Sequence, residues 1–360
     1  MRLKRLSKNF RELGVRVMTK WLDGDVVHQD VVISSRIRVA RNLMDYVFPL
    51  YMSVGESDNL TNDILTTMKE NHMSSNFKFL RIRDLTPRER LSYIEEHLIS
   101  PDLIQKVDKS SFLLRNDDKV TIMINEEDHL RIQTILPGLN LMECWELCSN
   151  IDDVLESKLE YAFHEDLGYL TACPTNVGTG LRASAMLHLP CLSMTGHINV
   201  LIESLRKVGL TVRGIYGEGT EAIGNLYQIS NQTTLGETEE EIIDKLYKII
   251  LQVVTRERNT RKYLMEKKGL ELEDKLFRSY GILSNCRLIN SKEAMNHLSN
   301  VKLAYDMGLL NNKKVNNIVE LMIKIKPATI QKDYNEDMTQ EERDKIRANI
   351  IRDYFLKTEG

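Results

Sequence analysis

The stretch VVISSRIR, residues 31–38, joins a short apolar run of β type to the alternating pair Arg36 and Arg38. Successive side chains of a strand point to opposite faces, so two arginines separated by one residue leave the same face. Two guanidinium groups on one face can hold a single polyphosphate through charge-assisted hydrogen bonds. The stretch therefore predicts a strand of a sheet that has one anion-binding face.

Further β-rich runs lie at 120–124, 130–135, 210–215 and 226–229. Apolar residues recur at helical spacing in two later stretches, which are Leu155, Leu159 and Ala162, and Ile242, Leu246, Ile249 and Val253. Strands and helices do not alternate strictly, which disfavours a doubly wound parallel sheet. We therefore expect the α+β class, with an antiparallel or mixed sheet flanked by helices.

The chain divides into three expected parts: an N-terminal arm at 1–29, a catalytic domain at 30–255 and a helical C-terminal domain at 256–360. The arm is strongly basic, typical of an amphipathic surface helix or of an organellar presequence. Residues 326–338 are interpreted as a connector. Thr339 and Glu342 form a capping-box pattern, which predicts one last helix behind it.

Composition excludes several classes of protein. The formal charge of −3 over 360 residues provides no general attraction to nucleic acid. No apolar run is long enough to span a bilayer, so no membrane anchorage is expected. Five cysteines without disulfide-like spacing suit a reducing cytoplasm. The sequence also lacks the usual P-loop and dinucleotide-binding glycine motifs, so arginines must bind any phosphate.

Four motifs carry the chemistry: SSRIR at 34–38, NEEDHLR at 125–131, CPTNVGTGLR at 173–182 and RGIYGEGTE at 213–221. Arg131 and Arg182 can complete a clamp with the first pair, and phosphoryl transfer depends on such positioning and charge compensation. An arginine acceptor needs carboxylates beside it, because a protonated guanidinium has no free lone pair. Glu127, with Glu218 or Glu221, can bind it and take its proton, and a Cys173 thiolate can add negative charge.

In this order, the motifs resemble those of the phosphagen kinases, the family of guanidino kinases that includes creatine kinase and arginine kinase. The resemblance covers roughly residues 30–255. It implies the fold of the phosphagen kinase catalytic domain, ATP and Mg²⁺ as cofactors, and no metal site made by the protein itself. The ATP-site residues that it implies are Ser34, Ser35, Arg36, Ile37, Arg38, His97, Arg131, Arg182, Ala183, Ser184, Ala185, Met186, Arg213, Gly214, Ile215, Tyr216, Gly217 and Glu218.

Two departures separate the chain from small-molecule guanidino kinases. Only 33 residues precede the SSRIR motif, where those enzymes carry a helical domain that covers the small substrate. Tyr216 stands where they place a further arginine, and Arg213 is expected to replace it. Together with the helical extension, these departures are similar to the bacterial protein-arginine kinases of the McsB family. That resemblance implies client proteins with accessible arginines, a zinc-binding activator, the CtsR heat-shock repressor, the Clp protease system and an even-numbered oligomer.

The last predicted helix carries RDKIRA at 343–348. It resembles a motif of that family that forms a phosphoarginine-binding pocket, made here by Arg343, Asp344, Arg347 and Ala348. Read from spacing alone, the same residues form a salt-bridged surface helix. The resemblance favours a product-sensing, allosteric pocket.

Three functions stay open at this point. The favoured one is a cytoplasmic protein-arginine kinase that marks clients for degradation. A kinase of free arginine or a related metabolite would need another element to cover its substrate. A non-enzymatic regulator that keeps the fold is expected to have substituted catalytic positions, and apart from Tyr216 they are intact.

Overall fold

The computed structural model describes residues 19–24, 26–216, 222–310 and 318–356. Most of the predicted basic arm lies outside these residues. The main sheet has eight strands in the order β2-β3-β4-β5-β1-β8-β10-β9, and every neighbouring pair is antiparallel. Its strands are β1 (Val32–Arg41), β2 (Phe77–Arg81), β3 (Ser111–Arg115), β4 (Val120–Ile124), β5 (Leu130–Pro137), β8 (Leu181–His188), β9 (Leu210–Tyr216) and β10 (Ala222–Asn231). This confirms the predicted α+β class.

A short hairpin of β6 (Phe163–His164) and β7 (Gly168–Tyr169) stands apart from the main sheet. The α-helices are α2 (Val54–Glu70), α3 (Pro87–Glu95), α4 (Leu141–Glu156), α5 (Pro190–Met194), α6 (His197–Lys207), α7 (Glu239–Asn285), α8 (Ser291–Asp306), α9 (Ile318–Lys324), α10 (Pro327–Tyr334) and α11 (Gln340–Leu356). Five single 3-10 turns complete the elements, at Lys20–Leu22, Ser74–Asn76, Ile82–Asp84, Leu103–Gln105 and Pro174–Asn176.

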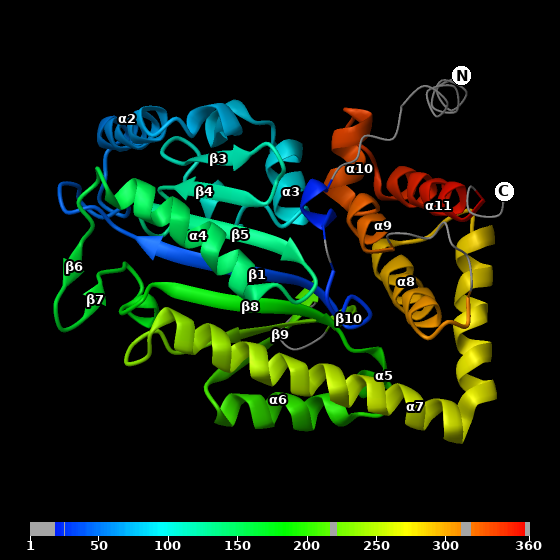
Figure 1. Cartoon of the computed structure of the whole chain (residues 1–360). Coiled ribbons are helices and arrows are strands. Elements are labelled where there is room, and N and C mark those ends of the chain that lie inside the picture. The colour runs from blue at the N-terminus through cyan, green and yellow to red at the C-terminus, as the bar shows by residue number, and fades with distance from the viewer. Residues whose placement is uncertain (1–18, 25, 217–221, 311–317, 357–360) are drawn as a thin grey trace.

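One face of the sheet carries the main hydrophobic core. Ile37 and Val39 alternate along β1 with the arginines and are buried there, together with residues of α2, α4 and α7. Figure 1 shows α4 and α7 lying side by side across this face. Burial of this apolar surface is the main stabilising contribution to the catalytic domain. Because the apolar residues of β1 take one face, its arginines are left on the other.

On the opposite face, the described residues form hydrophobic clusters towards its two ends. A cluster with Trp21, Phe112 and Met123 packs at the β2–β3 side, where the Trp21 indole Nε1 donates to Glu96 O at 3.1 Å. At the other end, α8 packs on β10 and buries Met186 and Leu226 in a core shared with α7, α9 and α11. The central strands β5, β1 and β8 lie between these two clusters.

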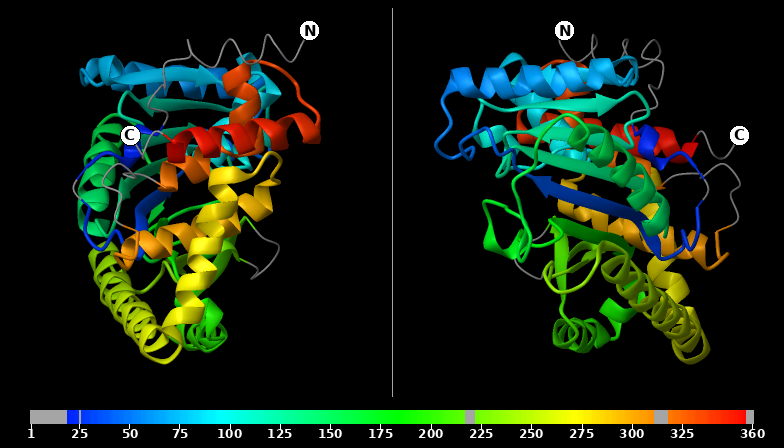
Figure 2. Two further views of the ribbon diagram at one scale, coloured as in Figure 1. Left: turned by 90° about the vertical axis from the view of Figure 1, so that its right-hand side faces the viewer. Right: turned by 60° about the vertical axis from the view of Figure 1, so that its left-hand side comes forward.

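The helical part begins within α7. This helix is interrupted by non-helical dihedral angles at Lys268, and Figure 1 shows it turning sharply towards the C-terminal helices. Its second half stands beside α8 and α11 (Figure 2). The expected domain boundary at 255/256 falls inside the first, continuous half of α7, ahead of this interruption.

Two local predictions were wrong. The helix α4 ends at Glu156, so Leu159 and Ala162 are not helical; Ala162 instead donates its amide to Asn42 O at 2.7 Å. Residues 326–338 are not a simple connector, because they contain α10. The capping box of the last helix is confirmed, since Thr339 and Glu342 exchange hydrogen bonds ahead of α11.

No helix among the described residues is both long and apolar enough to cross a membrane.

Candidate active site

The strand register places five arginines on one face of the sheet. Directly opposite residues of an antiparallel pair project to the same side. Arg38 of β1 lies opposite Arg182 of β8, and Arg131 of β5 lies opposite Ala40, two residues from Arg38. Gln228 of β10 lies opposite both Met186 and Arg213, which brings Arg213 of β9 to the same side. With Arg36, these residues form what we call the arginine face: Arg36, Arg38, Arg131, Arg182 and Arg213.

The charge of the arginine face is only partly compensated. Burial, followed by repulsion from Arg36, Arg131 and Arg182, holds the pKa of Arg38 well below its ordinary value, and Glu126 offsets only part of this. Burial and repulsion from Arg213 and Arg131 also lower the pKa of Arg182. Crowded like charges of this kind are stabilised by a bound anion.

Two buried hydrogen-bond donors on this face also indicate that it binds an anion. Nε of Arg38 and Nε of Arg182 are both buried without a hydrogen-bond partner among the described residues. Unsatisfied buried donors are rare in folded proteins, and these two lie on neighbouring strands of the same positively charged face. They fit the phosphate oxygens of a nucleotide.

The other expected ATP-site residues divide between the two faces. Ser34 and Ser184 share the register of the arginine face, while Met186 of the same register is packed against the helical part. The residues that alternate with these along the strands point to the other face of the sheet. Ile37, Ala183 and Ala185 lie in the main core, and the Ser35 hydroxyl donates to Gly138 O. Any contact of these four with a nucleotide is therefore through the backbone.

His97 lies over the same face. Its carbonyl accepts from Gln133 Nε2 at 3.0 Å, and Gln133 is the β5 partner of Arg38. Its ring packs edge-on to Trp21, with 6.5 Å between centroids. Burial, then the charges of Lys326 and Arg36, hold the pKa of His97 well below its ordinary value. The ring is therefore neutral, and it adds no charge to the arginine face.

The carboxylates lie in the turn between β4 and β5. Asn125 takes a positive φ of 58°, which asparagine tolerates, and its amide donates to His129 O to close the turn. Glu126 is buried and pairs with Arg131 while accepting from Ser100. Asp128 accepts from Asn42 Nδ2 and from the Ala172 amide, each at 2.6 Å. Glu126 and Asp128 therefore hold the turn in place.

Glu127 is the member of the turn that remains accessible. Its side chain is 44% exposed, and its nearest cation is Arg131, with Nη2 4.0 Å from Oε2. Burial, then repulsion from Asp128, raise the pKa of Glu127, although Arg131 acts in the opposite direction. A carboxylate with a raised pKa and a free approach suits proton abstraction from an acceptor.

Cys173 and Glu127 both act electrostatically on Arg182, which belongs to the arginine face. The charges of Cys173 and Glu127 both act on Arg182 and raise its pKa, against the larger effect of burial. The Cys173 sulfur lies 3.0 Å from the Thr175 hydroxyl and is half-buried. The arginine face, Glu127 and Cys173 therefore belong to one electrostatic neighbourhood.

Part of the predicted site cannot be placed. Gly217, Glu218 and Glu221 lie outside the described residues, and the choice between Glu218 and Glu221 stays a prediction. Gly214 and Ile215 lie on β9 next to Arg213, and Tyr216 ends that strand.

Sequence reasoning missed two contributors. Gln228 accepts from Arg36 Nη2 at 2.6 Å through Oε1, across 192 residues of chain, and only the β1-β8-β10 order reveals this contact. Glu126 is the buried anchor of Arg131, whereas the NEED motif shows two adjacent glutamates without distinguishing them. The apolar residues Ile124 and Leu130 on either side of the turn were the available signal that part of it is buried.

The C-terminal arginines are engaged differently. Arg347 is 1% exposed, and its guanidinium donates to Ile325 O, Ile289 O and Asp344. Arg343 is half-buried and donates to Met338 O, while Ala348 is buried in the helical core. Within the RDKIRA motif, Arg343 is thus the arginine that keeps an accessible side chain.

Among the described residues, no group of three or more His, Cys, Asp or Glu side chains is arranged to hold a metal ion. A nucleotide-bound Mg²⁺ is coordinated largely by phosphate oxygens and water, with one or two carboxylates.

Comparison with known families matches two models to the chain from residue 59 onward. Residues 59–260 match the C-terminal catalytic domain of ATP:guanido phosphotransferases, and residues 269–360 match the C-terminal domain of the protein-arginine kinase McsB. The two matches meet on either side of the interruption at Lys268.

Curated relatives agree along almost their full length. The chain is 46% identical over 338 residues to a protein-arginine kinase from Desulforamulus reducens, covering 93% of this chain and 95% of the relative. It is 47% identical to a protein-arginine kinase from Halalkalibacterium halodurans, covering 93% and 94%. It is also 46% identical to one from Geobacillus stearothermophilus, covering 93% of each chain.

Solved structures share the fold. A lombricine kinase superimposes with a TM-score of 0.56 at 26% identity, over 66% of this chain and 69% of its own. The duplicated taurocyamine kinase from Schistosoma mansoni, solved with transition-state analogue components, has a TM-score of 0.60 at 22% identity, over 77% of this chain and 40% of its own.

Proposed function

The chain belongs to the protein-arginine kinase family of ATP:guanido phosphotransferases, and from this premise we propose that its arginine face holds Mg-ATP while Glu127 receives the acceptor arginine of a protein. The phosphotransferase activity itself follows from the family. The observation that carries the assignment of residues is the register pair Arg38–Arg182, whose Nε atoms are buried without partners beside Glu127.

The chemistry follows from the charges. The arginine face offsets the charge of the triphosphate, and ADP leaves as the γ-phosphoryl group passes to a guanidinium nitrogen of the acceptor. The acceptor must lose a proton for that nitrogen to become a nucleophile, and Glu127, whose pKa is raised, takes it. Glu218 or Glu221 is proposed as the second carboxylate, and Cys173 adds negative charge near the acceptor.

We place Mg²⁺ on the nucleotide phosphates in this proposal. Five arginines already lie on this face, so the proposal gives the metal to the phosphate oxygens and not to the arginine side of the site.

The wider role rests on the family resemblance. We propose that phosphorylated clients are passed to a Clp protease, that a CtsR-type heat-shock repressor is one substrate, and that a zinc-binding activator and an even-numbered oligomer regulate the enzyme in the cytoplasm. The Arg343–Asp344–Arg347 region is proposed as a phosphoarginine pocket, in which Arg343 offers the accessible guanidinium.

The test is phosphate transfer from Mg-ATP to an unfolded protein and, separately, to free arginine, scored by mass spectrometry for acid-labile phosphate on arginine. We expect label on protein arginine. Label on free arginine alone would establish a metabolite kinase instead. No label on either, even with an activator protein present, would favour a regulator without enzymatic activity.

Glu127→Gln is the matched variant for this assay. It removes the proton acceptor and keeps the shape of an accessible side chain, so transfer should fall by about 10²–10⁴-fold while nucleotide affinity is retained. Glu266→Gln, which changes an exposed carboxylate of α7, is the control and should transfer phosphate at the wild-type rate. Loss of nucleotide binding in Glu127→Gln would contradict the acceptor role.

A further inference from the structure

The turn between β4 and β5, residues 125–129, carries Glu127 and is called the catalytic turn below. The loop between β1 and α2, residues 42–53, and the start of α2 contact the two ends of this turn. On one side, the Leu43 amide donates to His129 Nδ1 at 3.0 Å, so Nε2 carries the ring hydrogen and donates to Val47 O at 2.8 Å. On the other side, Ser57 in the first turns of α2 accepts from Asn125 Nδ2 at 2.8 Å. Glu127 therefore sits between the two anchor points of this loop.

The loop exposes apolar side chains to solvent. Leu50 is 72% exposed and Tyr51 is 81% exposed, and Met44 and Val47 are exposed beside them. Phe48 stacks on the His129 ring, with 6.2 Å between centroids, which holds this part of the loop against the catalytic turn. Single exposed apolar residues are ordinary, but a group on one short loop beside a catalytic turn marks an interaction surface.

The β6–β7 hairpin adds to this surface. It is joined to the loop by the Leu43–Tyr161 bridge and by the Met44 amide, which donates to Glu160 O at 3.0 Å. Phe163 and Leu167 are exposed on it. Figure 1 shows the hairpin and the loop at the same end of the sheet, beyond the end of β1. We call this surface the apolar rim and define it as Met44, Val47, Leu50, Tyr51, Phe163 and Leu167.

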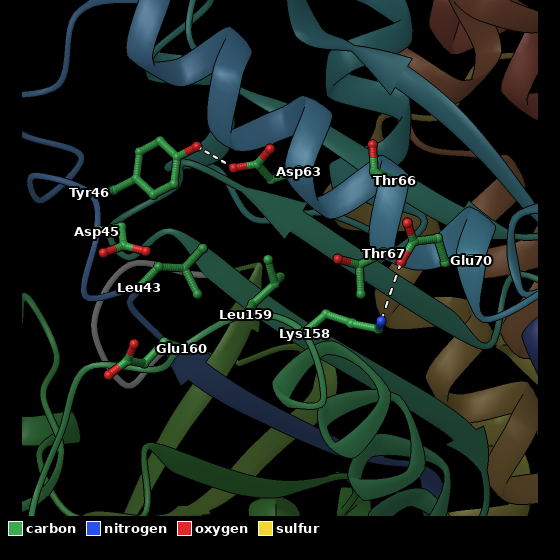
Figure 3. Close-up of a pocket in the computed structure, with 10 residues that line it drawn as sticks. All are labelled: Leu43, Asp45, Tyr46, Asp63, Thr66, Thr67, Glu70, Lys158, Leu159 and Glu160. Atoms are coloured by element: carbon green, nitrogen blue, oxygen red, sulfur yellow. Dashed lines mark hydrogen bonds and ion pairs between the residues drawn. The ribbon is translucent and has the colours of Figure 1, made fainter.

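An acidic pocket adjoins the rim (Figure 3). It has a volume of about 280 Å³ and lies between the loop, α2 and the segment after α4. Asp45, Asp63, Glu70 and Glu160 line it against one lysine, Lys158, which lies 3.6 Å from Glu70. In the part of the chain that the structure describes, Asp45 and Glu160 form no ion pair. The pocket is near the lower limit of ligand-site volumes, about 300 Å³, and suits a single side chain.

We propose that the apolar rim and the acidic pocket dock an extended stretch of the protein substrate on either side of its acceptor arginine. Apolar side chains next to the arginine pack on the rim, and a lysine or arginine farther along enters the pocket. This inference rests on the proposed function and adds to it a sequence preference for the acceptor site.

The charges and the contacts favour this occupant over others. Four carboxylates against one lysine attract a basic side chain and repel the phosphates of an anionic lipid surface. A second copy of the chain bound permanently to the rim would cover the turn that holds Glu127, because the loop is hydrogen-bonded to His129 at one end of that turn and Ser57 of α2 to Asn125 at the other. A substrate segment must reach this turn in any case, so its flanking residues meet the rim.

The experiment compares three arginine peptides with the full-length enzyme. The first has leucine on both sides of the arginine and a lysine a few residues away; the second replaces the leucines by serine, and the third replaces the lysine by serine. For the wild-type enzyme we expect kcat/KM on the first peptide to exceed that on the second by about tenfold, mainly through KM. A smaller preference, of about threefold and lost at high salt, is expected over the third.

Variants of the enzyme test whether the apolar rim and the acidic pocket cause these peptide preferences. The double variant Leu50→Ser/Tyr51→Ser should bring the ratio between the first two peptides close to one, and Asp45→Asn should do so for the first and third. Leu270→Ser on α7, where Leu270 is 83% exposed, is the control and should keep both wild-type ratios. Because these side chains are exposed, all variants are expected to fold, and thermal unfolding checks this.

The outcomes separate the two proposals. If the wild-type enzyme phosphorylates no arginine in any peptide or protein, the proposed function fails. If it phosphorylates all three peptides with equal kcat/KM, or if the double variant keeps the wild-type preference, the docking surface is wrong while the proposed function stands. If the double variant instead changes the oligomeric state and not the peptide ratio, the rim is an interface between copies.

Discussion

Arg38 and Arg41 are three residues apart on β1 and lie on opposite faces of the sheet. Arg41, on the core face, is 1% exposed; it pairs with Asp152 through Nε at 3.0 Å and Nη2 at 2.6 Å, and donates to Ala40 O and Thr179 O. Its guanidinium carbon also lies 3.5 Å from the centroid of the Tyr169 ring. Arg38, by contrast, faces three other arginines and has a buried Nε without a partner among the described residues.

The pKa shifts of the two arginines express this difference. Burial disfavours both charges and is the largest single effect on each, but at Arg41 Asp152, Tyr169 and Tyr161 together outweigh it and raise the pKa. At Arg38 repulsion from other arginines adds to burial and lowers the pKa. Arg41 is paired with a carboxylate within the fold, whereas Arg38 lies among like charges, as expected for the nucleotide site proposed above. In the helical part, Arg347 is buried and bonded to two backbone carbonyls and to Asp344, whereas Arg343 is accessible; burial nevertheless lowers the pKa of Arg347, unlike that of Arg41.

The largest expected effect is on catalysis, from Arg38→Gln. The variant removes one cation of the arginine face and should lower kcat/KM for phosphate transfer by about 10³-fold, as the loss of other arginine contacts to a transferring phosphoryl group does. The free energy of unfolding without nucleotide should stay unchanged or rise, because a repelled charge is lost. Steady-state kinetics and urea unfolding measure the two effects. A clearly less stable variant would contradict the contrast with Arg41.

The opposite result is expected for Arg41→Gln. This change leaves Asp152 buried without its cation, which costs about 3–5 kcal/mol of unfolding free energy in comparable cases. Catalytic activity per folded molecule should stay near the wild-type value, because Arg41 does not reach the arginine face. Urea unfolding, together with activity normalised to folded protein, checks both parts. A variant as stable as the wild type would show that the buried pair contributes no net stability.

The alternation of Arg36 and Arg38 was enough to predict that both arginines leave one face of a strand, because the two-residue period of a strand is a local property. The α+β class and the turn that carries Glu127 were also predictable, from the β-rich runs and from the motif. The pairing of Arg38 with Arg182 was not, since it depends on β8 entering the sheet beside β1. The different environments of Arg38 and Arg41 could not be predicted either, because they depend on which charged side chains the fold brings next to each arginine.

The helix α10 was not predicted, because part of what stabilises it comes from a distant part of the chain. Its N-terminus is capped from outside, since the Glu95 carboxylate of α3 accepts from the Ala328 and Thr329 amides at 3.0 and 2.8 Å. Pro327 at the first helical position was a local signal, but the Glu95 cap comes from more than 230 residues earlier in the chain. The capping box of α11 lies within the chain segment itself, and that helix was predicted correctly.

His188 is a further buried group whose charge is disfavoured by burial and by nearby cations, as it is at Arg38. Burial, then the charges of Lys302 and Arg261, hold its pKa well below 6.5, so it is neutral in the folded chain. Below about pH 6.5 the unfolded chain gains a proton that the folded chain does not, so the free energy of unfolding falls by up to about 1.4 kcal/mol per pH unit. The stabilisation is therefore complete above about pH 6.5 and declines as the pH falls.

The test of this pH effect compares the wild type with His188→Gln between pH 7.5 and 5.5. Glutamine does not titrate and can still bond to the Ser299 hydroxyl, which His188 Nε2 contacts at 2.8 Å. The stability advantage of the wild type should shrink as the pH falls. Burial raises the pKa of Asp118 and of Asp333 to about 6, which gives the opposite slope in both proteins, so only their difference isolates His188. A constant difference would mean that His188 is protonated in the fold.

The smallest effect is expected from Arg343→Ala. Arg343 makes one bond to a backbone carbonyl, Met338 O, so its loss should lower the unfolding free energy by about 1 kcal/mol or less and leave phosphate transfer detectable. Binding of phosphoarginine peptides should weaken by about tenfold, because the accessible guanidinium of the proposed pocket is lost. Arg278→Ala is the control, since Arg278 is an exposed arginine of α7 that pairs with Asp274 and makes no contact with the Asp344–Arg347 pair in the described part of the chain. Equal peptide binding by the two variants would place the pocket elsewhere.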